Sequence, residues 1–182
     1  MHTQRIAAVD LAATSGKTRE HLDAFGAKLG LIPQMVLTMA QAPAVLDGYV
    51  ALSGALGRGT LGAKLGELVA TTVAETNGCT YCLGAHYAIG KLVGVAEEAL
   101  AAARHATSPD PRTAAALTFV RRVTEARGHV TEADVATVRA AGFSEGQVGE
   151  LVAHVALNIL TNYFNLVANT EVDLPLPAEA GS

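Results

Sequence analysis

The chain has two cysteines, and their type and spacing suggest chemistry more strongly than any other residues do. They form the segment Cys79-Thr-Tyr-Cys82, which directly follows Asn77-Gly78. An Asn-Gly pair is typical of a helix end, so the cysteines are expected to open the next helix. There, unpaired backbone N–H groups and the positive end of the helix dipole favour the thiolate, the reactive form of cysteine. The pair can exist as a dithiol or as a disulfide.

His86 follows Cys82 by four residues, so on a helix the two side chains share one face. An imidazole there can take the proton of the Cys82 thiol and return it to a leaving group. The segment from Cys79 to His86 therefore predicts a redox or nucleophilic site. Inert core cysteines, a structural disulfide and a metal site completed by one distant ligand are the alternatives.

Glu67 is the carboxylate that best fits the same site. If the chain reverses at Asn77-Gly78 and the flanking helices pack antiparallel, Glu67 and His86 come level to within about one helical turn. Three small residues share the face of Glu67 and let another helix approach: Ala63, Ala70 and Ala74. This arrangement predicts a Glu67–His86 proton relay, with an exposed glutamate near a helix start as the alternative. Glu75, at the end of the same helix, is expected in solvent.

The helices that position these residues follow from apolar periodicity, capping residues and Gly or Pro breakers. We predict helices over 17–29, 43–56, 60–77, 79–91, 96–105, 111–127, 131–140 and 144–168, with a short apolar turn over 35–39. Thr60 is the expected N-cap of its helix, and Ser144 with Gln147 forms a capping box. The last helix is nearly continuously apolar and is expected at the centre of the fold or at an interface.

A polar stripe interrupts this last helix. Its members recur every three or four residues: His154, Asn158, Asn162, Asn165 and Asn169. Buried amides and imidazoles need hydrogen-bond partners. His154 and Asn158 are therefore possible pocket residues near Glu67, and a polar network between helices or subunits is the alternative.

Composition predicts an all-α, single-domain protein. Thirty-five of the 182 residues are alanine, which has the highest helix propensity, and no run alternates β-branched and polar residues. We expect an N-terminal arm over 1–15, a helical domain over 16–170 and a Pro-rich tail over 171–182. The mean hydropathy of +0.30 suggests apolar faces that pack against other subunits, and hence a homo-oligomer.

Charge and hydropathy also exclude several classes of protein. The net charge is −4 and the pI is near 5.8, so a basic nucleic-acid footprint is absent. No uninterrupted apolar run approaches the length of a membrane span, and the first residues lack the pattern of a secretory signal. We therefore expect a cytoplasmic protein with no nucleic-acid or membrane partner.

The motif as a whole is familiar. The motif consists of Glu67, then eleven residues, Cys79-x-x-Cys82, three residues and His86. This pattern resembles the core of the AhpD-like alkylhydroperoxidases of the carboxymuconolactone decarboxylase superfamily. The segments 28–33 and 154–165 are similar to the peroxidase-related branch of this superfamily. The resemblance implies an all-helical fold and a thiol peroxidase that acts on hydrogen peroxide or organic hydroperoxides.

The resemblance also assigns roles. Cys82 attacks the peroxide as the peroxidatic cysteine, and Cys79 resolves the sulfenic acid to a redox-active disulfide. His86 relays the proton, and Glu67 orients His86 or connects it to solvent. Tyr81, a possible pocket residue, stands where some members carry a histidine.

The resemblance implies partners as well. No bound cofactor or metal is expected, and a dithiol reductant, either a lipoyl-bearing or a thioredoxin-like protein, resets the disulfide. Trimers or hexamers are the implied assemblies. Two alternatives remain: a decarboxylase-like lyase that uses His86 and Glu67 in the same pocket, and a non-enzymatic redox or metal-binding module.

Overall fold

Helices make up the scaffold in the computed structural model, which describes residues 3–174. A short 3-10 helix, Leu11–Ala13, precedes nine α-helices in this part of the chain: α1 Gly16–Leu29, α2 Gln34–Met39, α3 Pro43–Leu56, α4 Ala63–Thr76, α5 Thr80–Leu92, α6 Glu97–Arg104, α7 Pro111–Glu125, α8 Glu132–Ala140 and α9 Glu145–Ala168. None of the described residues forms a strand. The predicted all-α class is therefore confirmed.

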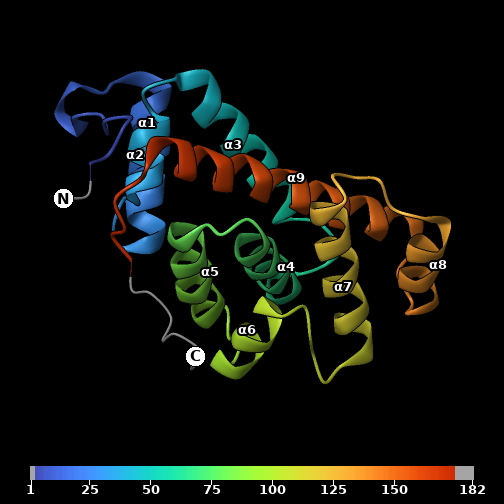
Figure 1. Ribbon diagram of the computed structural model, residues 1–182. Helices are drawn as coiled ribbons and strands as arrows, with labels where there is room; N and C mark the ends of the chain where they lie inside the picture. Colours follow the sequence, from blue (N-terminus) through green and yellow to red (C-terminus); the bar gives the residue numbers. More distant parts are fainter. Residues whose placement is uncertain (1–2, 175–182) are drawn as a thin grey trace.

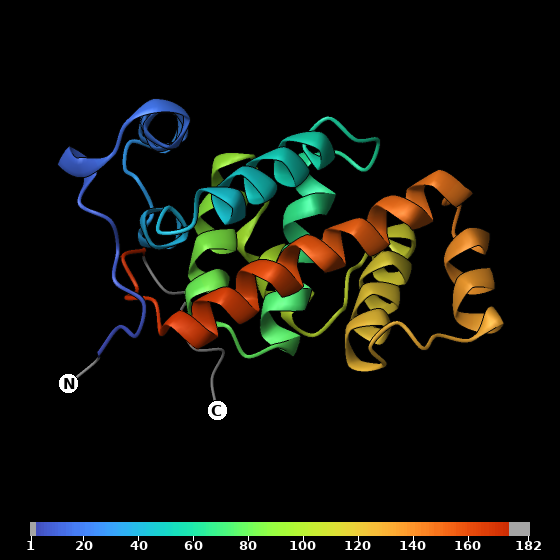
Figure 2. The same ribbon diagram turned by 90° about the horizontal axis from the view of Figure 1, so that it is seen from above.

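α4 is the central helix and α9 is the longest one. α4 contacts α5, α6, α7 and α9, and α9 runs across the bundle against α3, α4, α5, α7 and α8 (Figures 1 and 2). At its far end α9 meets the N-terminal arm, where the backbone N–H of Arg5 donates to the carbonyl of Ala168 at 2.7 Å. The fold thus brings α4, α5 and the second half of α9 together around one region.

Local signals explain the hairpin of α4 and α5. α4 ends at Thr76, Asn77 caps it, and Gly78 has a φ of +67°, which few residues other than glycine adopt readily. Cys79 then caps the start of α5. The chain reverses at Asn77-Gly78, as predicted, so residues far from the turn on one helix face residues far from it on the other.

Two buried apolar clusters hold the bundle together. One contains both cysteines, with Met35, Met39 and Leu46 from the N-terminal helices. The other joins α4 to α7, α8 and α9 through residues such as Val69, Val73, Leu117, Val120 and Leu151. Since α4 contributes to both clusters, its orientation is fixed from two sides.

Two predictions about elements are wrong. Residues 35–39 form helix α2 rather than a turn, because Val36 and Met39 are fully buried and the helix satisfies their backbone groups. Thr60 does not cap α4, which begins at Ala63 behind Gly62. Instead the hydroxyl of Thr60 donates to the carboxylate of Glu150 at 2.9 Å, and so the long-range contact replaces the local cap.

Other helix ends agree with the structure to within about two residues, the usual scatter of such boundaries. The capping box of Ser144 and Gln147 is present. The division into arm, helical domain and tail stays a prediction; residues 1–2 of the arm and 175–182 of the tail lie outside the described residues.

α9 has the length and apolar character of a membrane-crossing helix, the only one among residues 3–174 that does. Seven of its residues are buried in the bundle, among them Leu151, Val155 and Asn165. A central helix of a water-soluble domain has these same properties, since its neighbours cover an apolar surface on several sides.

Candidate active site

Cys79 and Cys82 lie at the buried start of α5. Their sulfurs are joined in a disulfide with the Cα atoms 5.3 Å apart, and their side chains are only 2% and 3% exposed. Cys79 is the N-cap residue, and its sulfur accepts the backbone N–H of Cys82 at 3.2 Å. The motif therefore sits where free N–H groups stabilise negative charge on sulfur.

Glu67 and His86 meet across the hairpin. The Nδ1 atom of His86 lies 2.9 Å from Oε2 of Glu67, and both side chains are about four-fifths buried. A carboxylate at Nδ1 holds the proton on that nitrogen and leaves Nε2 with a free lone pair. The contact expected from the spacing of these two residues is present, and it gives His86 the form that can accept a proton at Nε2.

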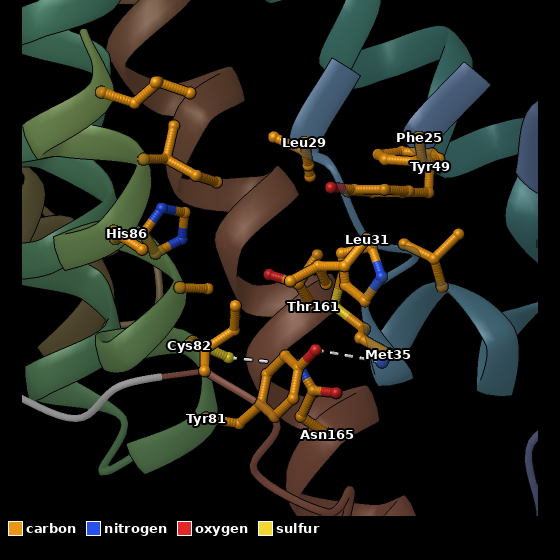
Figure 3. A pocket seen from close by; sticks show the side chains of 17 residues that line it. Phe25, Leu29, Leu31, Met35, Tyr49, Tyr81, Cys82, His86, Thr161 and Asn165 are labelled. Atoms are coloured by element: carbon orange, nitrogen blue, oxygen red, sulfur yellow. Dashed lines mark hydrogen bonds between the residues drawn. The ribbon is translucent and has the colours of Figure 1, made fainter. Parts of the chain in front are cut away.

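A cavity of about 370 Å³ opens beside Cys82 (Figure 3). Apolar side chains form most of its wall: Phe25, Leu29, Leu31, Pro33, Met35, Val36, Ala85, Ala88, Ile89, Leu92 and Leu174. Within residues 3–174, few of the residues that line it carry polar groups: Cys82, His86, Thr161, Asn165, Tyr49 and Tyr81. Cys79 does not line the cavity. Of the two cysteines, Cys82 is therefore the one that a small organic molecule in the cavity would contact.

Two tyrosines complete the cavity wall. The hydroxyl of Tyr81 accepts the backbone N–H of Met35 at 3.1 Å, which ties the cysteine motif to α2. Burial raises the pKa of Tyr81 well above its ordinary value, and it raises the pKa of Tyr49 to about 12. Both hydroxyls therefore stay protonated at neutral pH. The expected place of Tyr81 in the pocket wall agrees with the structure.

A second cavity of about 460 Å³ is lined by both Glu67 and His86. His154 and Asn158 line this second cavity, not the one that holds Cys82. His86 borders both cavities, so the Glu67–His86 pair stands in the wall that the cavities share. Burial lowers the pKa of His154, although the nearby carboxylates of Glu150 and Glu67 oppose the effect. His154 is therefore placed near Glu67, as expected, but away from the sulfur.

Asn165 is the site residue that the sequence did not single out. It lies on α9, 83 residues from Cys82, and its Nδ2 is 3.3 Å from the Cys82 sulfur. The polar stripe on α9 was the only signal for it, because the spacing places Asn158 and Asn165 on one face without saying which of them meets the cysteines.

Glu75 corrects a further prediction. Its Oε2 lies 2.6 Å from Nε of Arg104 and the carboxylate is two-thirds buried, so it is paired rather than free in solvent. As for a metal, no group of three or more His, Cys, Asp or Glu residues within 3–174 is arranged to hold one. The arrangement instead brings a cysteine pair and a histidine held by a carboxylate together beside an apolar cavity.

Comparisons with known proteins place this site in a family. The sequence model of the carboxymuconolactone decarboxylase family matches residues 43–126, which contain Glu67, both cysteines and His86. A solved structure of the alkylhydroperoxidase AhpD core, an uncharacterized peroxidase-related protein from Ralstonia eutropha JMP134, matches with a TM-score of 0.84 and 27% identity over 93% of this chain and 92% of that one. The family match and this shared fold support an AhpD-like protein of the carboxymuconolactone decarboxylase superfamily.

Other solved structures share the fold of this AhpD-like chain. An uncharacterized peroxidase-related protein from Silicibacter sp. TM1040 matches with a TM-score of 0.81 and 22% identity over 94% of both chains. The debrominase Bmp8, in complex with 2,3,4-tribromopyrrole, matches with a TM-score of 0.81 and 18% identity over 94% of this chain and 92% of that one. No curated protein matches the sequence.

Proposed function

We propose that this protein is a thiol-dependent peroxidase that reduces hydrogen peroxide or organic hydroperoxides through a Cys79–Cys82 dithiol/disulfide cycle. One observation carries the proposal: the sulfur of Cys82 borders an apolar cavity beside His86, whose Nδ1 is held by Glu67. The bonded sulfurs show that the two cysteines lie close enough to complete such a cycle without a large movement.

The first step oxidises Cys82. Its thiolate attacks the distal oxygen of the peroxide, so that an S–O bond forms and the O–O bond breaks. His86 holds the proton taken from the thiol on Nε2 and gives it to the departing alkoxide, which leaves as an alcohol or as water. Cys82 becomes a sulfenic acid. The Glu67 carboxylate stabilises the transient imidazolium, and this is its role in the relay.

The second step uses Cys79. Its thiolate attacks the sulfur of the sulfenic acid, an S–S bond forms, and hydroxide leaves and is protonated to water. A dithiol reductant of the lipoyl-bearing or thioredoxin-like class then supplies two electrons by thiol–disulfide exchange and restores both thiols. No bound cofactor or metal enters this cycle. A cytoplasmic location, where thiols are kept reduced, suits it.

A homo-oligomer, a trimer or hexamer, is part of the proposal. α9 exposes a run of apolar residues on one face: Val152, Leu160, Tyr163 and Val167, which are 44%, 40%, 54% and 64% exposed. Water-soluble monomers rarely expose a continuous apolar face of this kind, and a second subunit would cover it.

The test counts free thiols. Reduced protein, freed of reductant, receives one equivalent of cumene hydroperoxide, and thiols are counted under denaturing conditions. We expect a fall from two thiols to none within seconds, reversed by dihydrolipoamide. In Cys79→Ala a sulfenic acid is expected on Cys82, and dimedone with mass spectrometry detects it. Two unchanged thiols over minutes would contradict the proposal, and a sulfenic acid found only on Cys79, in Cys82→Ala, would reverse the two roles.

Reductive dehalogenation is the second candidate, because the apolar, tyrosine-bordered cavity beside Cys82 suits a small halogenated heteroaromatic as well as a peroxide. In that reaction the dithiol gives two electrons to a carbon–bromine bond, a proton replaces the bromine, and bromide and the Cys79–Cys82 disulfide are the products. Release of bromide from 2,3,4-tribromopyrrole by the reduced protein tests it. A lyase that relies on Glu67 and His86 is distinguished from both, since its activity would survive Cys79→Ser/Cys82→Ser.

A further inference from the structure

Asn165 brings a hydrogen-bond donor to one sulfur of the motif and not to the other. Its Nδ2 lies 3.3 Å from the Cys82 sulfur, and the asparagine is only 3% exposed (Figure 3). A buried amide beside a disulfide sulfur makes a weak hydrogen bond. After reduction the same sulfur carries the charge of a thiolate, and the same bond becomes charge-assisted and much stronger.

Thr170 sets the orientation of this amide. Its hydroxyl donates to Oδ1 of Asn165 at 2.8 Å, and its own side chain is buried. Asn169 ends α9 in the left-handed conformation, at a φ of 49°. The chain turns there so that the backbone N–H of Thr170 also donates to the backbone carbonyl of Asn165 at 3.1 Å. Oδ1 is therefore occupied, and the N–H groups of the amide are directed at the sulfur.

The two cysteines compete for the role of nucleophile. As the N-cap residue, Cys79 accepts the backbone N–H of Cys82 at 3.2 Å, a contact that favours its thiolate. On local geometry alone, Cys79 would be the more acidic of the two. Asn165 donates instead to the sulfur of Cys82, the cysteine that lines the cavity, and so offsets the greater acidity of Cys79.

We infer that Asn165 is a catalytic residue: its side-chain N–H stabilises the thiolate of Cys82 and makes Cys82, rather than Cys79, the cysteine that attacks the substrate. The inference depends on the proposed function only for the use of a thiolate at Cys82. It assigns to the end of α9 a part in the chemistry that the Glu67, Cys79, Cys82 and His86 motif does not contain.

Other titratable groups around the sulfur come from several elements. Tyr81 and His86 of α5 and Tyr49 of α3 line the same cavity, and Glu67 of α4 reaches it through His86. Asp173 of the C-terminal segment lies near the Tyr81 hydroxyl. All of them are unchanged in the variants below, so differences between those variants report on Asn165.

The test titrates single thiols without any substrate. Cys79→Ser keeps Cys82 and also keeps a good N-cap side chain, while Cys82→Ser keeps Cys79. Thiolate absorbance at 240 nm against pH gives the midpoint of ionisation for each. We expect the midpoint of Cys82 to lie below that of Cys79, and this comparison needs no change at Asn165. The opposite order overturns the inference.

Asn165→Leu, made in the Cys79→Ser protein, removes the donor at similar volume. We expect the midpoint of Cys82 to rise by about one pH unit, so that the thiolate fraction below the midpoint falls about tenfold. Asn158→Leu is the matched control, because Asn158 lies on the same helix and is equally buried at 3%, yet its Nδ2 bonds to the carbonyl of His154. It should leave the midpoint where it was.

Two further variants cover a failure of Asn165→Leu to fold. Asn165→Asp keeps the shape and places a carboxylate beside the thiolate, so the midpoint should rise further. Thr170→Val leaves the asparagine but removes the hydroxyl that orients it, and a smaller rise is expected. Unchanged midpoints in folded variants overturn the inference. Because no peroxide is used, an inactive peroxidase with shifted midpoints contradicts only the proposed function, and an active one without shifts contradicts only the role of Asn165.

Discussion

Replacing Glu67 by glutamine tests how much the carboxylate contributes to the relay. The amide oxygen of the introduced glutamine can still accept from Nδ1 of His86, so the hydrogen bond survives and only the charge is lost. The native contact is 2.9 Å long and both side chains are less than a fifth exposed, so solvent screens it little. A hydrogen bond to a charged group contributes about 1.5–3 kcal/mol, against about 0.5–1.5 kcal/mol for a neutral one. The imidazolium formed in the first step therefore loses about 1–1.5 kcal/mol of stabilisation.

A loss of this size lowers the rate about tenfold, since each 1.36 kcal/mol of activation free energy is a factor of ten. The assay is the kcat/KM for cumene hydroperoxide with dihydrolipoamide as reductant. Glu75→Gln is the matched control, because Glu75 lies on the same helix and has an ion pair of its own, with Arg104 at 2.6 Å. It should lose stability but keep the rate. A Glu67→Gln protein within twofold of the wild type would refute the reasoning, since the charge at Nδ1 would then play no part.

Three further predictions concern stability and the cavity. Burial lowers the pKa of His154 below its ordinary 6.5, so on acidification the unfolded chain binds a proton at this histidine before the folded chain does. The free energy of unfolding should therefore fall as the pH drops below about 6.5, and it should fall less steeply in His154→Leu. Urea titrations of both proteins at pH 5 and 7.5 measure this difference. Gly90→Val places a Cβ only 2.8 Å from Cδ2 of the fully buried Leu100 and should cost about 2 kcal/mol, a fall in Tm of about 5 °C. Gly48→Val should cost less, because apart from its chain neighbours and its own helix backbone nothing lies within 4 Å of the added Cβ. Equal losses in a thermal melt would contradict this. Ala88→Phe narrows the cavity of about 370 Å³. It should lower kcat/KM for the bulky cumene hydroperoxide at least fivefold more than it lowers kcat/KM for hydrogen peroxide. Equal losses for the two peroxides would show that the substrate binds elsewhere.

What the sequence predicts well is local. The reversal at Asn77-Gly78 and the capping box at Ser144 each depend on residues within a few positions of one another, and both are present. The same locality places the two cysteines at a helix start. The Glu67–His86 contact spans 19 residues, yet it follows from the hairpin because the turn fixes the register of both helices.

What the sequence predicts poorly depends on contacts across the fold. The pairing of Glu75 with Arg104 and the contact of Thr60 with Glu150 join residues 29 and 90 positions apart. Neither partner carries a local signal for the other. Asn165 is the clearest case: the stripe on α9 indicates buried amides, but the rotation of α9 against α5 decides which amide meets sulfur. Chemistry that depends on the packing of helices far apart in the sequence needs the structure.

The position of the Glu67–His86 pair between two cavities bears on the proposed reaction. The cavity beside Cys82 is walled mainly by apolar side chains, which suits an organic hydroperoxide but offers few groups that can supply protons. Glu67 lines only the second cavity, together with His154 and Asn158, while His86 borders both. The proton for the leaving group can therefore be replaced from the second cavity while substrate fills the first. In the proposed reaction, a relay placed in this wall lets the sulfur keep an apolar surrounding without isolating it from protons, and it gives the carboxylate and the histidine separate roles.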